Sequence, residues 1–120
     1  MCRERDIAVV IGAPYASGIL ARGPRPGALY RYAPAEPESI AKVERIAAVC
    51  QRHDVPLAAA ALQFPFGHPS VVSVIPGPVT VKEVRVNLAC MRREIPEALW
   101  AELRAERLIR SDAPTPHRCL

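Results

Sequence analysis

The chain has 120 residues, of which 50% are hydrophobic, and its 16 Lys and Arg against 12 Asp and Glu give a formal net charge of +4. This hydrophobic content excludes an intrinsically disordered polypeptide, and the dispersion of the basic residues argues against a nucleic-acid-binding arm. No stretch approaches the roughly 18 consecutive apolar residues of a membrane span, and the N-terminal residues lack the apolar segment of a secretory signal.

The first predicted element is a strand over residues 7–11, whose sequence IAVVI lies between Asp6 and Gly12. A continuous apolar run is typical of a parallel strand buried on both faces, because a half-exposed strand alternates apolar and polar residues. Residues 13–37 then combine Gly, Pro and Tyr without a clear period. Loops of this length in compact domains are usually functional or mobile, so we interpret this segment as an active-site loop.

Two helices are predicted next. Apolar residues recur at helical spacing over residues 37–52, between an acidic start and a basic end that suit the helix dipole. Pro56 then opens the sequence LAAAALQF, which predicts an apolar helix that ends before Gly67. This second helix must be buried on nearly every side.

The second half of the chain begins with another buried strand, VVSVI at residues 71–75, which the sequence PGP ends. Thr80 and Glu83 match a capping box, which predicts a helix that runs to about residue 91. A last helix is expected from residue 96 to about 109, with Leu99, Trp100, Leu103 and Leu108 on its apolar side. Residues 111–120 are predicted to be a frayed, disordered tail.

This order of strands and helices predicts an α/β protein with parallel strands. Two strands cannot form a sheet that buries both of them, because a doubly covered strand needs a neighbour on each side. The chain therefore reads as an incomplete domain.

Three segments carry a resemblance: VVIGAPYASGIL at 9–20, VPLAAAALQFPFGHPSVVSVIPG at 55–77, and the spaced pattern over 80–87. Together they resemble the last third of the aldo/keto reductases, closest to the bacterial L-fucose, D-threo-aldose and pyridoxal dehydrogenases. The resemblance implies the C-terminal fragment of a (β/α)₈ TIM barrel over residues 1–110, with strands seven and eight and a C-terminal helix. It also implies that the loops after the two strands hold NADP or NAD, in agreement with the usual phosphate site of such barrels.

In the loop after the first strand, the resemblance implies that Pro14, Tyr15, Ser17 and Gly18 contact the cofactor pyrophosphate. Gly18 would allow backbone to approach a phosphate, and the Ser17 hydroxyl can donate to one. Taken alone, these residue types predict only a turn.

After the second strand, Gly77, Val79 and Thr80 correspond to residues beside the adenosine phosphate, and Asn87 to the residue that binds the adenine edge. A helix N-terminus at this place favours an anion through its free N–H groups and its dipole. Taken alone, Thr80 would be only an N-cap and Asn87 a solvated helix residue.

Three positions depart from the family pattern. Relatives commonly carry Arg in place of Val79, Glu in place of Val86, and an aromatic that stacks on the nicotinamide in place of Gly12. Because Arg is the natural partner of a 2′-phosphate, Val79 weakens the case for NADP over NAD.

The family's catalytic Asp, Tyr, Lys and His would precede Cys2, so we assign no catalytic residue and expect the chain to be inactive by itself. Loop, surface or tail positions are expected for the remaining candidates, which are Tyr15, Tyr30, Tyr32, His53, His68 and His117. The four cysteines lack metal-ligand or CxxC spacing. We therefore predict no metal site, reduced thiols and a cytoplasmic protein.

Two functions from different classes stay open. The first is part of an NAD(P)-dependent oxidoreductase that acts on aldehydes, ketones or aldose sugars. The second is a non-catalytic remnant or split-barrel subunit that self-associates or pairs with a chain carrying strands one to six. A small basic nucleic-acid binder is a third reading, which the dispersed charge and the few aromatic residues disfavour.

Overall fold

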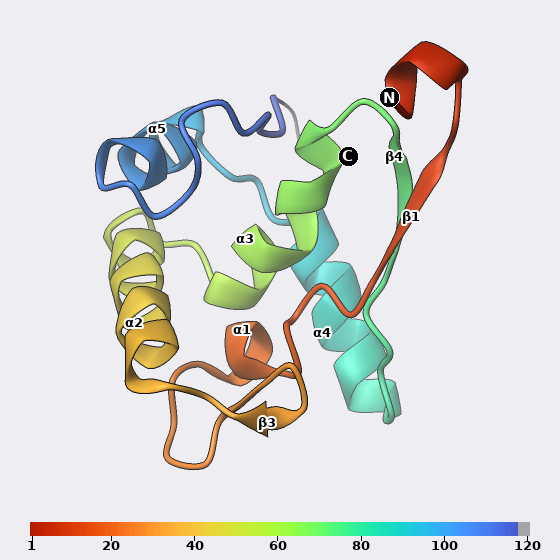
Figure 1. Ribbon diagram of the computed structural model, residues 1–120. Coiled ribbons are helices and arrows are strands. Elements are labelled where there is room, and N and C mark those ends of the chain that lie inside the picture. Colours follow the sequence, from red (N-terminus) through yellow and green to blue (C-terminus); the bar gives the residue numbers. More distant parts are fainter. Residues whose placement is uncertain (118–120) are drawn as a thin grey trace.

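A computed structural model of the protein describes residues 1–117. Helices stand on one side of a small parallel sheet (Figure 1). The strands are β1 (Val9–Gly12), β2 (Leu29–Tyr30), β3 (Ala33–Pro34) and β4 (Val71–Ile75). The helices are α1 (Ile19–Arg22), α2 (Pro37–Arg52), α3 (Leu57–Gln63), α4 (Val81–Arg92) and α5 (Glu97–Ala105), with 3₁₀ turns at Arg3–Arg5 and Phe64–Gly67.

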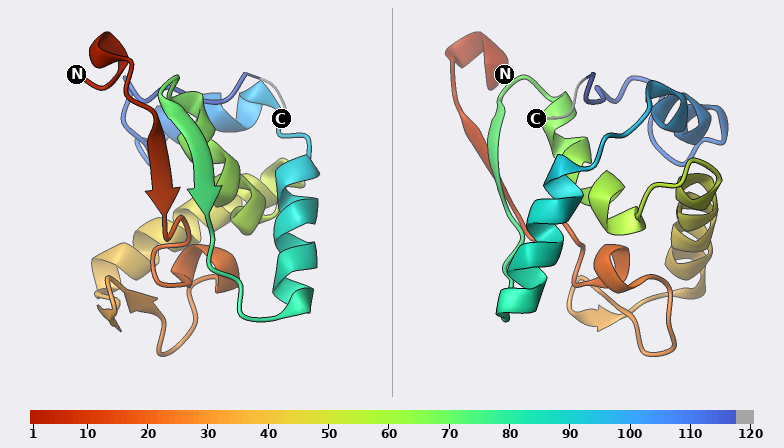
Figure 2. Two further views of the ribbon diagram at one scale, coloured as in Figure 1. Left: turned by 90° about the vertical axis from the view of Figure 1, so that its right-hand side faces the viewer. Right: turned by 180° about the vertical axis from the view of Figure 1, so that it is seen from behind.

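The sheet pairs β1 with β4 in parallel, from Val9 opposite Val71 to Gly12 opposite Ile75. Both predicted strands are therefore confirmed, the first with a shift of one or two residues. Val72 is 60% exposed and Ile75 is 58% exposed, so the burial on both faces that the apolar runs indicate is not reached within this chain, as we expected of two strands without further neighbours. The reason is that the helices cover one face, whereas no described element covers the other (Figure 2).

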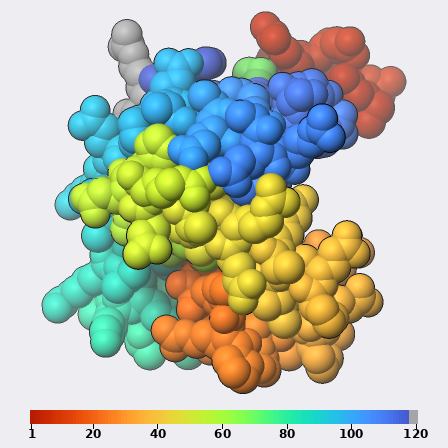
Figure 3. Space-filling view, turned by 90° about the vertical axis from the view of Figure 1, so that its left-hand side faces the viewer, coloured from red at the N-terminus to blue at the C-terminus, as the bar shows by residue number. Residues whose placement is uncertain are grey.

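The core lies among the helices. Its most deeply buried large side chains are Val49, Cys50, Leu62, Leu99, Trp100 and Leu103. Helix α2 has the predicted bounds, and every residue of α3 is buried or half-buried, as the apolar sequence required. Figure 3 shows α2 and α5 packed together on the side away from the sheet. Within residues 1–117, no helix is both long and apolar enough to cross a bilayer.

The last helix ends about four residues earlier than predicted. Arg107 adopts a left-handed conformation with φ of 57°, and the N–H of Leu108 donates to the carbonyl of Leu103 at 2.9 Å. This turn folds Leu108 back onto the core, where its side chain is 3% exposed. Apolar residues at helical spacing continue beyond the last residue of α5, and the predicted helix end is too late for this reason.

Two segments are more ordered than the sequence indicated. The predicted loop over residues 13–37 contains helix α1 and the antiparallel β2–β3 pair. In the predicted tail, Arg104 donates to the Ala113 carbonyl at 2.9 Å and to Thr115 Oγ1 at 2.8 Å. Thr115 is 3% exposed, so this part of the tail packs against the helices. Residues 118–120 of the predicted tail lie outside the described residues.

Candidate functional site

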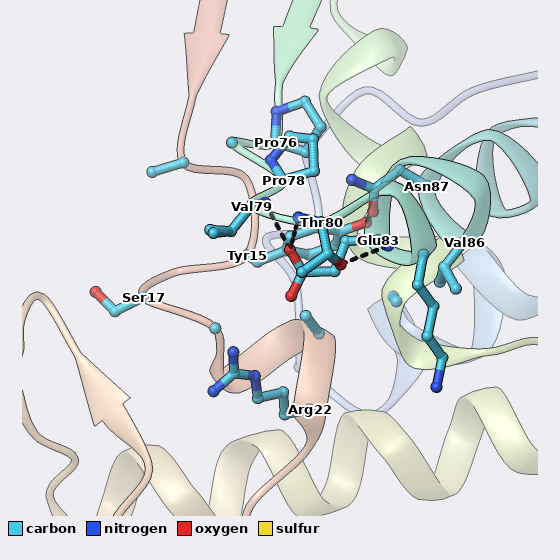
Figure 4. Close-up of a pocket in the computed structure, with 16 residues that line it drawn as sticks. Tyr15, Ser17, Arg22, Pro76, Pro78, Val79, Thr80, Glu83, Val86 and Asn87 are labelled. Carbon is cyan, nitrogen blue, oxygen red and sulfur yellow. Dashed lines mark hydrogen bonds between the residues drawn. The ribbon is translucent and has the colours of Figure 1, made fainter.

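A cavity of about 550 Å³ lies where the carboxyl ends of β1 and β4 meet (Figure 4). Because parallel strands end at the same edge of a sheet, the loops that follow them converge there. Its walls come from the loop after β1, helix α1, the loop after β4 and the first turns of α4. The lining residues are Ala13, Tyr15, Ser17, Gly18, Ala21, Arg22, Ala58, Pro76, Gly77, Pro78, Val79, Thr80, Lys82, Glu83, Val86 and Asn87.

The structure brings together seven of the eight residues that the sequence singled out. Tyr15, Ser17, Gly18, Gly77, Val79, Thr80 and Asn87 line the cavity, whereas Pro14 does not. Pro14 is half-buried in the loop before Tyr15. The convergence is a matter of geometry, and the role of these residues as cofactor contacts stays a prediction.

The loop after β1 has an unusual backbone. Ala13, Ala16 and Ser17 have φ values of 50°, 49° and 64°, in the left-handed region that residues with a side chain seldom adopt. Gly18, with φ of 94°, completes the turn, and its N–H donates to the Tyr15 carbonyl at 2.9 Å. The Ser17 hydroxyl oxygen accepts from the Tyr32 N–H at 3.0 Å, which ties the turn to the β2–β3 pair.

The opposite wall starts with the predicted capping box, which is confirmed. The Glu83 N–H donates to Thr80 Oγ1 at 3.2 Å, and the Glu83 carboxylate accepts from the N–H groups of Val79 at 2.6 Å and Thr80 at 3.3 Å. These N–H bonds, that of Val79 foremost, hold the pKa of the Glu83 carboxyl below its usual value. The expectation that the amides at this helix start are free is wrong for Val79, Thr80 and Glu83, because the capping box already uses them.

A hydrogen bond joins the two walls. The Tyr15 hydroxyl donates to Asn87 Oδ1 at 2.7 Å, although the two residues are 72 positions apart in the sequence. Burial raises the pKa of Tyr15 to about 12, and the nearby Cys90 thiol adds to the shift. The phenol therefore stays a donor over the whole ordinary pH range.

These contacts leave hydrogen-bond donors for a ligand. Ser17, Thr80 and Asn87 each use a side-chain oxygen as an acceptor within the protein. Their hydroxyl or amide hydrogens stay able to donate, since a hydroxyl both donates and accepts and an amide carries two N–H groups. The cavity walls consequently suit a ligand that is rich in acceptor oxygens and nitrogens.

The charged residues of the cavity also favour a ligand that is rich in acceptor oxygens. Arg22 from α1 and Lys82 from α4 line the cavity, against the single carboxylate of Glu83. The positive charge of Arg22 contributes to the lowered pKa of Glu83. From the sequence we did not assign Arg22 or Lys82 to the site, and we assigned Glu83 only to the helix cap. The position of Arg22, one helical turn after Gly18, was a signal in the sequence that could have indicated its place in the site.

The family model described as "Aldo/keto reductase family" matches residues 1–107. The chain belongs to the aldo/keto reductase family. It is 40% identical over 110 residues to pyridoxal 4-dehydrogenase of Microbacterium luteolum, a match that covers 91% of this chain and 32% of the relative. It is also 40% identical over 116 residues to D-threo-aldose 1-dehydrogenase of Pseudomonas sp, which covers 96% of this chain and 34% of the relative. The chain thus spans about a third of the length of the curated relatives it matches.

The three positions at which we expect a departure from the family pattern line the cavity or adjoin a residue that does. Val79 and Val86, where the resemblance implied charged side chains in relatives, line it and are 89% and 48% exposed. A Cβ built at Gly12 meets nothing within 4 Å, so this position has room for a side chain.

The other tyrosines and histidines lie away from the cavity. Tyr30, Tyr32, His68 and His117 are exposed, in agreement with the prediction of loop, surface or tail positions. His53 differs, because it caps the C-terminus of α2 and its Nε2 lies 2.5 Å from Glu102 Oε2 in α5. Within residues 1–117, His, Cys, Asp and Glu form no group of three that could hold a metal ion.

Proposed function

We propose that this chain forms the NAD(P)-binding corner of an aldo/keto reductase barrel, with β1 and β4 as its seventh and eighth strands. The complete protein would be an NAD(P)-dependent oxidoreductase that acts on aldehydes, ketones or aldose sugars. The observation that carries the proposal is the cavity at the carboxyl ends of both strands, whose polar side chains retain their donors. The printed names of the relatives, a pyridoxal and an aldose dehydrogenase, support the carbonyl or sugar substrate.

The residues of the cavity fit a dinucleotide of this kind. Ser17 and Gly18 would take the pyrophosphate, Gly77, Val79 and Thr80 the adenosine phosphate, and Asn87 the adenine edge. Arg22 and Lys82 supply positive charge that the phosphates require. Val79 offers no guanidinium to a 2′-phosphate, so both NADP and NAD stay candidates. When bound, the nicotinamide supplies the hydride chemistry.

Binding to the 120-residue chain tests this assignment directly. Titration with NADP and with NAD, followed by ¹⁵N–¹H NMR, should shift the amide signals of Ser17, Gly18 and Thr80. Arg22→Gln should weaken binding about 2- to 5-fold, as expected for an exposed charge pair. The matched control is Arg110→Gln, whose side chain is 83% exposed outside the cavity and should leave binding unchanged. Equal effects of the two variants, or shifts scattered over the surface, would refute the site.

The chain by itself should not turn over substrate. It lacks the proton-donating tyrosine and its partners, and a barrel of this type needs about 250 residues. The assay is nicotinamide absorbance with an aldose, an aldehyde and a ketone. Turnover of any of them by the purified chain would refute the proposed inactivity.

A second candidate is a split-barrel subunit, and the uncovered face of the sheet favours it. Val10, Val72 and Ile75 are each more than half exposed, and exposed apolar side chains on a sheet are a docking surface or an aggregation hazard. The partner would be a polypeptide that carries the six remaining strands.

The test of this second candidate mixes the chain with D-threo-aldose 1-dehydrogenase from which the matching third has been removed. Recovery of dehydrogenase activity would support pairing, and Val72→Lys should abolish the recovery. Tyr32→Lys is the control, since Tyr32 is 85% exposed in the turn between β2 and β3, which form a sheet separate from β1 and β4. Self-association of the chain without recovery of dehydrogenase activity would reject the split barrel, and the exposed face would then be only an aggregation hazard.

A further inference from the structure

The bond between Tyr15 and Asn87 connects the two parts of the candidate site. Tyr15 belongs to the loop after β1, whereas Asn87 lies on α4, and the hydroxyl donates to Oδ1 at 2.7 Å. Both residues line the cavity and both are half-buried. A contact between the phosphate loop and the expected base pocket can transmit the position of one to the other.

The chemistry of the two groups determines how the amide is turned. A phenol has one hydrogen to donate, and an amide accepts only through its oxygen. The oxygen of Asn87 is therefore held toward Tyr15, and its NH₂ group stays available on the remaining side. An Asn side chain without such a partner can turn its oxygen or its nitrogen toward a ligand with little preference.

The support behind Tyr15 is rigid. Its ring packs against the buried core, and its carbonyl accepts the N–H groups of Gly18 at 2.9 Å and Leu20 at 3.2 Å. The flanking Ala13 and Ala16 are held in left-handed conformations that alanine rarely adopts. Strained backbone of this kind persists where the surrounding structure fixes it, and it is common at ligand clamps.

We propose that Tyr15 is a positioning residue for base recognition. It holds the oxygen of Asn87 away from the ligand and presents the amide NH₂ to a hydrogen-bond acceptor on the edge of a purine. The inference rests on the proposed function, because it takes an adenine nucleotide as the ligand. It adds that base recognition by α4 depends on a hydroxyl from the opposite wall.

The test is a double-mutant cycle with Tyr15→Phe and Asn87→Ala, which removes the hydroxyl and the amide while keeping the phenyl ring. ADP and inorganic pyrophosphate are the probes, and dissociation constants come from NMR titration of the 120-residue chain. Each single variant should weaken ADP about 2- to 10-fold, the range of one hydrogen bond, and the double variant should be no weaker than Asn87→Ala. The Tyr15 hydroxyl is already used by Asn87, so its loss should not weaken a contact of this loop with phosphate. Pyrophosphate, which has no base, should therefore bind all of the variants equally, and Tyr32→Phe is the control for a tyrosine outside the cavity.

The outcomes separate the inference from the proposed function. Additive losses, or an equal loss of pyrophosphate binding in Tyr15→Phe, would overturn the positioning role and leave the nucleotide site in place. Failure of the unmodified chain to bind either probe would overturn the site and the inference together. A second measurement needs no ligand: Tyr15→Phe should shift the side-chain amide signals of Asn87, and unchanged signals would overturn the positioning role alone.

Discussion

Replacing Gln63 with Leu should destabilise the fold by removing the link between α3 and the end of α4. Gln63 is 3% exposed, and its Nε2 donates to the carbonyls of Cys90 at 2.7 Å and Arg93 at 2.8 Å. Each such bond contributes about 0.5–1.5 kcal/mol net, so the two together predict a loss of about 1–3 kcal/mol. Leu has a similar volume, and a cavity therefore adds little to the loss.

Urea unfolding followed by the fluorescence of Trp100, the single tryptophan of the chain, measures this loss. Gln51→Leu is the matched control, since Gln51 is exposed on α2 and should change stability by less than about 0.5 kcal/mol. Gln63→Glu sharpens the test, because an ionised carboxylate cannot donate to the carbonyls whereas a protonated one can. Its destabilisation should therefore grow as pH rises through the pKa of the introduced carboxyl. Equal stability of Gln63→Leu and the unmodified chain would refute the reasoning.

Three further perturbations probe other contacts. Gly67→Ala would place a Cβ 2.6 Å from the Thr115 Cα, so the C-terminal segment must move, and trypsin should then cut beyond α5 faster than in the unmodified chain. Bonds from His53 and Arg52 lower the pKa of Glu102, so its stabilising contribution is present above its usual value of 4.5 and is lost as pH falls below it. Glu102→Gln should therefore flatten the acid limb of a plot of stability against pH, and an unchanged limb would contradict this. Cys50 is 1% exposed and burial raises its pKa to about 11, so iodoacetamide at about pH 8 should modify it only after unfolding.

The elements that the sequence predicted well are those whose signals are local. VVSVI lies between His68 and the PGP sequence, and it forms β4 with the predicted bounds. Helix α4 begins at the Thr80 capping box because two reciprocal hydrogen bonds fix its start within four residues. The end of α5 has no such local signal, since Leu108 turns back onto the core only after the other helices are in place.

The sequence predicted those residues of the candidate site that belong to continuous segments of the family pattern. Tyr15 and Asn87 were each assigned from the resemblance, but their mutual bond follows from the parallel pairing of β1 and β4, which only the fold shows. Arg22 escaped the prediction because α1 was taken for a loop, and a short helix places its side chain in the cavity. Glu83 was assigned only to the cap, because its closeness to the rest of the cavity is a tertiary property.

The uncovered sheet and the cavity are physically connected. Residues 13–18 and 76–80 continue directly from β1 and β4, so the positions of both cavity walls depend on the pairing of these two strands. A two-stranded sheet is marginal in water by itself, and here Val10 and Val72 stay more than half exposed. Molecules in which the two strands have separated cannot bind a ligand between the walls. The apparent dissociation constant therefore equals the intrinsic one divided by the fraction of molecules in which the strands are paired. A partner that covers the exposed face of the sheet should therefore tighten nucleotide binding, although it touches no ligand. The helices of this chain cannot stabilise the strand pair in this way, because they already occupy the other face.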